Sequence, residues 1–292
     1  MGRVGAVAAA GMIILGLAAC QASGPGAPGS PSPAAGPSSP AAKPPSPVRT
    51  AMLPAESTSA ALRPAGNPPG PWHLAFDDSF GGGALNTAGW STGWLAQGIT
   101  PPVNSEELEC YNPAEVSVSG GVLTLSLIRH TASCGGKSRP YTSGMINSDG
   151  KFQFTYGFME ARIWMPGRGG RIIDWPAFWA DGQDWPRDGE IDVLEGLGGQ
   201  ACWHFVNPAG TRGGCARGTF SNGWHTFGAD WEPGSITYYY DGRVVGTIRS
   251  GITHAPMYLI INNATAHEFG IPVRVPASMR VAYVRVWQHP GQ

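Results

Sequence analysis

The sequence predicts an all-β domain in which antiparallel sheets pack around one core. Only 13% of the 292 residues are charged, whereas helical bundles and coiled coils carry many Glu, Lys and Arg on their faces. After residue 71, short runs of alternating apolar and polar residues are separated by Gly, Pro, Asn and Asp, and no comparable segment has the 3.6-residue period of a capped helix. Many short strands around one core require two packed sheets or a closed barrel, so we expect a sandwich.

Three parts of the chain carry the clearest strand pattern. In two of them, a pair of alternating segments flanks a two-residue turn. One of these turns is Asp241-Gly242, a dipeptide that readily adopts the positive φ angles of a type I′ turn. The predicted strands are Val116–Ser119 with Val122–Leu127, Ile236–Tyr240 with Arg243–Ile248, and the terminal strand Val281–Trp287.

The first 20 residues have the pattern of a targeting segment. Arg3 supplies a positive start, and residues 4–17 form a small or apolar run that is too short to span a membrane. The run ends in Leu17-Ala18-Ala19-Cys20, which resembles the lipobox of bacterial lipoproteins, in which the cysteine becomes lipidated. We expect a lipid anchor on Cys20, as the only membrane contact, at the extracellular face of the cell envelope. The alternative is an ordinary secretory signal and a secreted protein.

Residues 21–70 differ in composition from the rest of the chain. About three-quarters of them are Ala, Gly, Pro or Ser and none is aromatic, so they lack the apolar surface that would offset the entropy of ordering. We expect a disordered linker. Residues 71–292 then form one domain, because about 220 residues can bury a sizeable core, and we expect this domain to be a monomer.

Four cysteines remain after Cys20, an even number that suits an oxidising compartment. Three pairings are possible. Strong turn formers lie between Cys202 and Cys215, so we expect these two to pair across a hairpin or loop, which leaves Cys110 to pair with Cys134. A zinc site is the alternative, but no Cys-x-x-Cys spacing supports it.

The charge pattern excludes binding to nucleic acid. The formal net charge is -1 and Lys and Arg are not clustered, whereas binding to a phosphate backbone requires a clustered excess of them. Eleven Trp residues are many for this length. Indole rings are costly to expose, so they indicate either a deep core or a surface that stacks on flat apolar ligand faces, such as those of sugars.

The segment Gly189–Gly196 (GEIDVLEG) carries three acidic residues in six positions and is the most informative stretch for chemistry. On a strand, Glu190 and Asp192 point to one face. Glu195 follows Glu190 by five positions and would point away unless a β-bulge returns it to the acidic face. The two Glu backbones would then be ~13 Å apart, and their side chains could lean to the ~5–5.5 Å between carboxyls of a retaining glycosidase. The wider spacing of an inverting enzyme stays open.

Three carboxylates on one face repel one another, so at least one should keep its proton near neutral pH. This asymmetry suits a glycosidase, which needs one ionised nucleophile and one protonated acid. A calcium site and a solvated strand edge are the alternatives. Nearby Trp residues favour the glycosidase because they can stack on sugar rings; they are Trp164, Trp175, Trp179, Trp185 and Trp203.

A longer set of motifs resembles glycoside hydrolase family 16, in its laminarinase-like branch. The runs that carry the resemblance are Tyr156–Ile163 (YGFMEARI), Trp175–Trp179 (WPAFW), Trp185-Pro186 and the acidic segment, and the likeness extends from Phe76 to Val286. It implies a β-jelly-roll sandwich of two antiparallel sheets, with a substrate cleft across the concave sheet. It also implies retaining hydrolysis of internal β-linkages.

The resemblance assigns roles to individual residues. Glu190 matches the nucleophile, Glu195 the acid/base, and Asp192 the residue that hydrogen-bonds the nucleophile. The substrate-binding residues that it implies are Trp175, Trp179, Trp185, His204 beside the catalytic strand and Asn262 at the cleft edge.

The sequence also departs from the family pattern. Two stretches that build the cleft rim differ, Ile173-Asp174 and Asn263–His267, so the identity of the polysaccharide stays open. At two ligand positions of the family's structural calcium site the chain has Ser79 and Ala282. We therefore expect no metal and no cofactor.

Together these features predict a retaining endo-glycoside hydrolase that cleaves β-1,3-glucan or β-1,3-1,4-glucan by double displacement. One alternative is the same mechanism on another polysaccharide, such as a β-galactan, or transfer to a sugar acceptor in place of water. Another is a carbohydrate-binding protein without catalysis. The grouped carboxylates disfavour it, because a lectin has no need to place like charges together.

Overall fold

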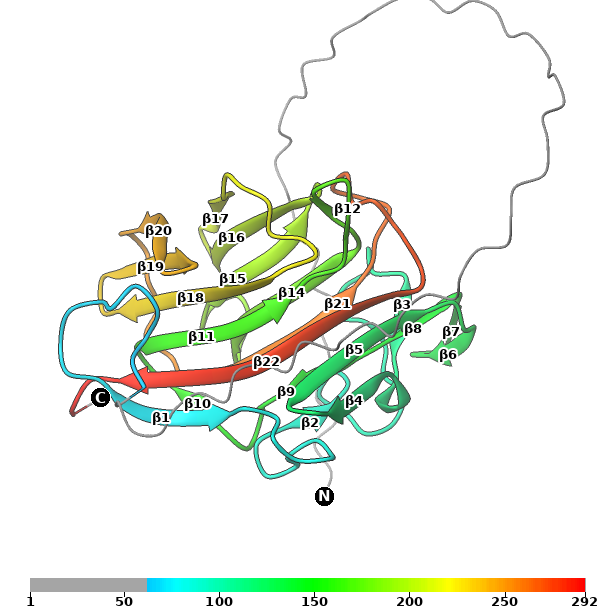
Figure 1. Cartoon of the computed structure of the whole chain (residues 1–292), viewed down its shortest axis with the longest axis horizontal. Helices are drawn as coiled ribbons and strands as arrows, with labels where there is room; N and C mark the ends of the chain where they lie inside the picture. Colours follow the sequence, from blue (N-terminus) through cyan, green and yellow to red (C-terminus); the bar gives the residue numbers. More distant parts are fainter. Residues whose placement is uncertain (1–61, 292) are drawn as a thin grey trace, which may run out of the picture. The chain divides into compact units, whose positions relative to one another are not determined.

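The computed structural model describes residues 62–291, which are almost entirely strands and turns (Figure 1). The helical element in this range is the 3₁₀ turn η1 (Pro113–Glu115), which the side chain of Asn112 caps. Within residues 62–291 no helix is long and apolar enough to cross a membrane. The predicted signal segment with Cys20, and the predicted linker up to residue 61, lie outside the described residues.

Ten strands form the larger sheet, called the outer sheet below. Its order is β20-β19-β18-β11-β22-β5-β8-β3, with β1 beside β22 and β4 beside β5. The neighbours are antiparallel except for β3 and β8. The long strand β22, red in Figure 1, runs between β11 and β5. The bounds are β1 (His73–Asp78), β3 (Glu109–Tyr111), β4 (Val116–Ser119), β5 (Val122–Ile128), β8 (Tyr141–Ser143), β11 (Gly157–Trp164), β18 (Trp224–Glu232), β19 (Ser235–Tyr240), β20 (Arg243–Ile248) and β22 (Ala277–Gln288).

Eight strands form the second sheet, called the inner sheet. Its order is β17-β16-β15-β14-β21-β9-β2, with β10 beside β21. Its strands are β2 (Ser91–Thr92), β9 (Met145–Asn147), β10 (Gln153–Phe154), β14 (Trp175–Gly182), β15 (Glu190–Leu197), β16 (Gln200–Asn207), β17 (Gly210–Cys215) and β21 (Met257–Ala264). Two small hairpins lie outside both sheets: β6 (Ala132–Cys134) with β7 (Lys137–Arg139), and β12 (Gly167–Arg168) with β13 (Arg171–Ile172).

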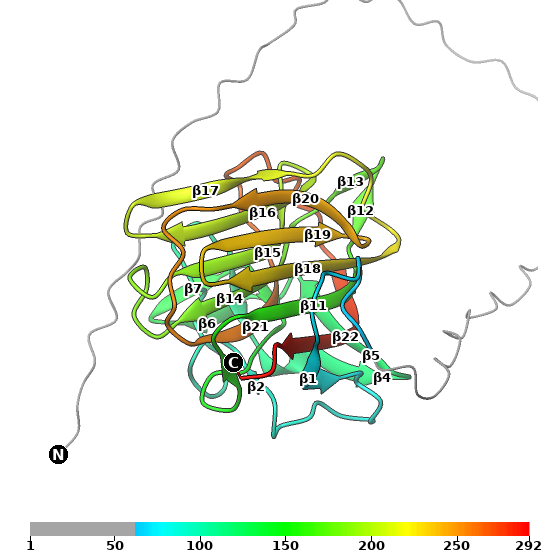
Figure 2. The ribbon, with the colours of Figure 1, turned by 90° about the vertical axis from the view of Figure 1, so that its left-hand side faces the viewer.

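Alternation along the strands places the core between the two sheets, whose strands run in nearly the same direction (Figure 2). In β5, Leu123, Leu125 and Leu127 are fully buried while the residues between them are partly exposed. The inner sheet contributes a matching set that includes Ile191 and Phe205. Burying these side chains on both facing surfaces is the main favourable term in folding. The predicted sandwich is confirmed.

The predicted strands are all present. The two predicted hairpins correspond to β4 with β5 and to β19 with β20, and the terminal strand corresponds to β22. At the second hairpin, Asp241 and Gly242 have φ angles of 48° and 71°, as a type I′ turn requires. The local turn chemistry therefore sets the register of this hairpin.

The chain just before β1 contacts the outer sheet. Composition assigns residues 62–70 to the linker, yet the Trp287 indole N–H donates to the carbonyl oxygen of Leu62 at 2.9 Å. The amide of Ala65 donates to the Glu160 carboxylate at 2.8 Å. These hydrogen bonds tie the segment to β11 and β22.

Both predicted disulfides are present. Cys202 and Cys215 face each other directly in the register of β16 and β17. Cys110 on β3 bonds to Cys134 on β6, and so ties the edge strand of the outer sheet to a hairpin. The pairing inferred from the turn formers between Cys202 and Cys215 is confirmed.

Two of the five Trp residues predicted to stack on sugars lie elsewhere. Trp203 points between the sheets and stacks on Tyr238 of β19, with ring centroids 4.8 Å apart. Trp164 lies on the outer face of β11 under the guanidinium of Arg280, 4.0 Å from the ring centroid. Trp203 has the parity of the core-facing residues of β16, whereas Trp164 belongs to the outer sheet. Of the two roles open for each Trp, core packing or stacking on sugars, neither of these two takes the second.

The space that Trp203 occupies depends on a glycine in the opposite sheet. A side chain at Gly246 of β20 would overlap the Trp203 indole, so we expect Gly246→Ala to lower the free energy of unfolding by ~1–3 kcal/mol through overpacking. Urea denaturation measures this change. Gly234→Ala is the control because nothing lies within 4 Å of its added methyl group. Equal stability of the two variants would contradict this account of the packing.

Candidate active site

A cleft lies on the face of the inner sheet that points away from the core. Alternate residues of β14, namely Trp175, Ala177, Trp179 and Asp181, line it in the period expected of a strand. The cavity has a volume of about 370 Å³. The side chains that line its other parts are Trp94, Leu95, Val103, Asn104, Glu107, Gln183, Asp184, Trp185, Glu190, Asp192, Glu195, Val206, Asn262 and Ala264.

A bulge in β15 brings three carboxyl groups to the cleft. Asp192 pairs with His204 and Glu195 with Cys202, so three steps along β15 match two along β16. The extra residue puts both Val193 and Leu194 into the core. Glu195 thereby returns to the face that carries Glu190 and Asp192, and all three line the cleft. The bulge predicted from the five-residue spacing is confirmed.

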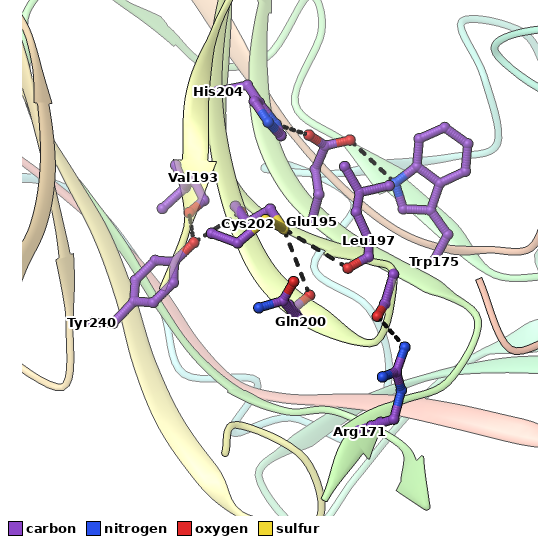
Figure 3. Close-up of a disulfide and its surroundings, with 11 residues drawn as sticks. Arg171, Trp175, Val193, Glu195, Leu197, Gln200, Cys202, His204 and Tyr240 are labelled. Atoms are coloured by element: carbon purple, nitrogen blue, oxygen red, sulfur yellow. Dashed lines mark hydrogen bonds and ion pairs between the residues drawn. A yellow bond between two sulfur atoms is a disulfide. The ribbon is translucent and has the colours of Figure 1, made fainter. Parts of the chain in front are cut away.

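Both oxygens of Glu195 are held by neighbouring strands (Figure 3). The indole N–H of Trp175 donates to Oε1 at 3.1 Å, and Nδ1 of His204 lies 2.5 Å from Oε2. Glu195 is only 4% exposed. A neutral His204 ring can accept the proton of a carboxylic acid or donate to a carboxylate, depending on its tautomer. This contact suits a carboxyl group that changes protonation state during a reaction.

The backbone around the bulge is held from the outer sheet. The hydroxyl of Tyr240 on β19 lies 2.9 Å from the carbonyl oxygens of both Val193 and Cys202 (Figure 3). One of these oxygens belongs to the bulge and the other to the strand beside it. Tyr240 therefore provides a hydrogen bond where the regular ladder between β15 and β16 is interrupted.

Glu190 lies between two carboxyl groups whose pKa values are raised. Burial raises the pKa of Asp192 well above its ordinary range, and the charges of Glu190 and Glu195 raise it further. Burial and the charge of Glu190 raise the pKa of Asp181 to about 8. Asp181 faces Glu190 across the β14–β15 pair. Asp181 is therefore mostly protonated at pH 7, and the pKa of Asp192 is shifted in the same direction, which agrees with the proton that the grouped carboxylates were predicted to keep.

Glu190 loses its proton more readily than Asp181 or Asp192. Burial raises its pKa to about 6, and hydrogen bonds from Asp192 and Trp185 limit the rise because they stabilise the charged form. The Trp185 indole N–H donates directly to Oε2 of Glu190. The arrangement leaves Glu190 ionised above about pH 6, hydrogen-bonded and open to the cleft.

The remaining predicted substrate-binding residues also gather at the cleft. Trp175, Trp179, Trp185 and Asn262 line it directly, and the Trp179 indole N–H donates to Oδ1 of Asn262 at 2.8 Å. His204 borders the site through its contact with Glu195. The structure thus brings together the five residues to which the family resemblance assigns substrate binding.

Three side chains at the cleft were missed by the sequence prediction. They are Trp94, which stacks on Trp179 with ring centroids 5.7 Å apart, and the hydrogen-bonded pair Glu107 and Tyr111. Trp94 and Glu107 come from the chain between β2 and β3, and Tyr111 from β3 itself, far from the acidic motif in sequence. The high Trp content indicated stacking surfaces, and Trp94 is one of the eleven Trp residues. No local pattern, however, predicted that it lies beside Trp179.

The residues at the family's calcium position do not fit such a site. Asp78 accepts a hydrogen bond at each carboxylate oxygen, from the amide of Phe80 at 2.8 Å and from the indole of Trp90 at 2.9 Å. Within residues 62–291, ligand atoms of three residues gather closely enough for a metal: those of Asp192, Glu195 and His204 lie within 4.8 Å of one another. The hydrogen bond between Glu195 and His204 already uses two of these groups, and we derive no step through a metal.

Comparisons with known proteins agree with this geometry. The model of the family "Glycosyl hydrolases family 16" matches residues 104–267. The chain belongs to this family. The match includes the acidic strand and Asn262, whereas Trp94, Leu95 and Val103 of the cleft lie before it.

Individual relatives of this family 16 chain include a β-glycanase and a β-glucanase by name. An endo-1,3-1,4-beta-glycanase of Rhizobium meliloti is 32% identical over 221 residues, which are 66% of this chain and 46% of the relative. A beta-glucanase of Rhodothermus marinus is 29% identical over 258 residues, which are 74% of this chain and 85% of the relative. The chain thus spans less than half the length of the Rhizobium protein.

A solved structure shares the architecture. The laminarinase catalytic domain of Thermotoga maritima superimposes with a TM-score of 0.66 at 25% identity, covering 74% of this chain and 98% of that domain. The predicted β-jelly-roll fold of the family is therefore confirmed for this chain.

The proton on Asp192 should control the charge on Glu190. Asp192→Ala removes a hydrogen bond to the Glu190 carboxylate, so we expect the pKa of Glu190 to rise from about 6. Asp192→Asn keeps a donor at this position, so it should leave the pKa of Glu190 close to the wild-type value. A ¹³C-carboxyl NMR titration measures both. A lower pKa of Glu190 in the alanine variant would show that charge repulsion outweighs the hydrogen bond.

Proposed function

We propose that this protein is a retaining, endo-acting glycoside hydrolase that cleaves β-1,3-glucan or β-1,3-1,4-glucan. The observation that carries the proposal is the placement of Glu190, Asp192 and Glu195 together in the cleft, with the Glu190 carboxylate hydrogen-bonded by Asp192 and Trp185 and Glu195 in contact with Trp175 and His204. The names of the relatives and the membership in family 16 support the substrate class.

In the first step Glu190 acts as the nucleophile. Its carboxylate attacks the anomeric carbon of the sugar and forms a glycosyl ester, while the glycosidic C–O bond breaks. Glu195 transfers its proton to the departing oxygen, so the leaving sugar chain departs as a neutral alcohol. The hydrogen bonds from Asp192 and Trp185 keep Glu190 ionised and oriented.

In the second step the roles of Glu195 are reversed. Its carboxylate takes a proton from water, whose oxygen attacks the anomeric carbon and displaces Glu190. Two inversions give net retention. His204 stabilises the Glu195 carboxylate after the first step, because Nδ1 already lies in hydrogen-bonding contact with Oε2.

We also propose that the enzyme works at the extracellular face of the cell envelope as a monomer. The basis is the amino-acid pattern of residues 1–70, with its lipobox-like end at Cys20 and its linker composition. Anchoring by a lipid would place the domain next to polysaccharide outside the cell.

A substrate screen tests the activity first. We expect reducing ends to be released from laminarin or lichenan and not from agarose or galactan. ¹H NMR of the first turnovers should show the β-anomer at the new reducing end, because double displacement retains configuration. An α-anomer as the initial product would exclude the mechanism, and release from galactan alone would point to the β-galactan alternative.

Variants of the two glutamates separate their roles. Glu190→Gly should lose turnover and regain it with azide, which would fill the vacated space and give an α-glycosyl azide. Glu195→Gln should lower kcat by roughly 10²–10⁴ by removing general acid–base catalysis. Full activity in either variant would refute the assignment, and bound glucan without turnover in the wild type would favour a carbohydrate-binding protein.

The pH dependence of kcat/KM reports the nucleophile. The pKa of Glu190 is raised to about 6, so its carboxylate predominates above this pH and is lost as pH falls below it. We therefore expect an acidic limb of the kcat/KM profile near pH 6. Initial rates on a β-glucan oligosaccharide between pH 4 and pH 8 measure it, and a profile that stays flat through this range would contradict the assignment.

A further inference from the structure

One hydroxyl group, that of Tyr111, links the cleft wall to a buried carboxylate. It donates to Oε2 of Glu107 at 2.6 Å and accepts from Nδ2 of Asn262 at 2.9 Å. Oδ1 of Asn262 accepts in turn from the Trp179 indole at 2.8 Å. Four side chains therefore form one directed chain of hydrogen bonds that starts at Trp179 and ends at Glu107.

The same tyrosine also supports the second aromatic residue of the wall. The backbone of Tyr111 exchanges two hydrogen bonds with Thr100, at 2.9 and 3.0 Å. The hydroxyl of Thr100 accepts from the amide of Trp94 at 2.9 Å. Trp94 and Trp179 lie nearly parallel, with an angle of 23° between their ring planes. Both indoles are thus connected to Tyr111, Trp94 through Thr100 and Trp179 through Asn262.

Glu107 is the point at which these contacts converge. It is 3% exposed, lines the cleft, and accepts hydrogen bonds from Tyr111, from the side chain of Asn104 at 3.0 Å and from the amide of Val103 at 3.4 Å. A hydrogen bond from the neighbouring Glu109 also acts on it. The shortest of these hydrogen bonds is the one from Tyr111, and together they fix the Glu107 side chain and the groups that donate to it.

This anchor is separate from the strand that carries the reacting carboxyl groups. Tyr111 belongs to β3 at the edge of the outer sheet, which the Cys110–Cys134 disulfide also holds. Glu190 and Glu195 belong to β15 of the inner sheet, and neither Glu107 nor Tyr111 has a hydrogen bond to them among those found in residues 62–291. A change at the anchor should therefore affect sugar binding more than bond cleavage.

We propose that Glu107 and Tyr111 are positioning residues that set the substrate-binding wall formed by Trp94, Trp179 and Asn262. The sugar that they help to bind is a unit of the β-glucan chain, and in this respect the inference rests on the proposed function. Without the relay, Asn262 and the Trp179 indole lose their fixed orientation toward a sugar ring, and binding weakens while the carboxyl groups stay in place.

Tyr111→Phe and Glu107→Gln test the relay. The first removes a single hydroxyl, and the second places an amide N–H among groups that are already donors. Each should raise KM for a laminari-oligosaccharide about tenfold, the factor that corresponds to one buried hydrogen bond of ~1.4 kcal/mol, with kcat within about twofold of wild type. Tyr283→Phe is the matched control. Its hydroxyl donates to Glu160 at 2.8 Å within the outer sheet, and its loss should leave KM unchanged.

A second readout does not depend on the substrate. The indole ¹⁵N–¹H resonance of Trp179, assigned from its loss in Trp179→Phe, should shift in Tyr111→Phe and Glu107→Gln and stay in place in Tyr283→Phe. An unmoved resonance in both cleft variants would overturn the proposal. A shifted resonance with unchanged KM would also overturn it, whether or not kcat is reduced.

The two proposals can fail separately. Wild-type protein that neither binds nor cleaves a β-glucan would contradict the proposed function, and the Trp179 resonance would still decide whether the relay exists. If Tyr111→Phe does not fold, Glu107→Gln alone gives both readouts.

Discussion

The bulge at Val193-Leu194 is the feature on which the site depends. A regular strand would turn Glu195 into the core, where an ionised carboxyl group has no compensating partner. The extra residue instead buries two apolar side chains in succession and returns Glu195 to the cleft. The interrupted ladder leaves backbone groups to satisfy, and the Tyr240 hydroxyl reaches them from the opposite sheet. The catalytic geometry is therefore maintained by the packing of the whole sandwich.

The charge distribution in the cleft follows from burial more than from residue type. Asp181, Glu190 and Asp192 have similar intrinsic acidity, yet burial and mutual repulsion raise the pKa values of the two aspartic acids. Hydrogen bonds from Asp192 and Trp185 then favour the charge on Glu190. Placing like groups close together thus favours ionisation of one of them, and the proton kept by Asp192 provides a hydrogen bond that stabilises its charge.

Local features of the sequence were sufficient for much of the fold and of the acidic site. The spacing of Glu190 and Glu195 predicted the bulge, and turn formers predicted both hairpins and the disulfide pairing. Contacts between distant segments had no such signal. Trp203 and His204 are neighbours in sequence, yet one enters the core and the other meets Glu195. Tyr111 reaches Asn262 across 151 positions, a pairing that only the packing of β3 against the inner sheet creates.

Bond cleavage and substrate binding make different demands on the fold. Bond cleavage requires carboxyl groups fixed to within a fraction of an ångström, which a strand paired on both sides provides. Recognition of a polysaccharide needs a wide aromatic surface, and the loop between β2 and β3 adds Trp94 to Trp179 and Asn262 of the inner sheet. A side chain on a loop is freer to rotate, at a cost in binding entropy. The contacts through Thr100 and Tyr111 reduce this freedom. Glu107 and Tyr111 therefore do for the wall formed by Trp94, Trp179 and Asn262 what the bulge and Tyr240 do for the reacting strand.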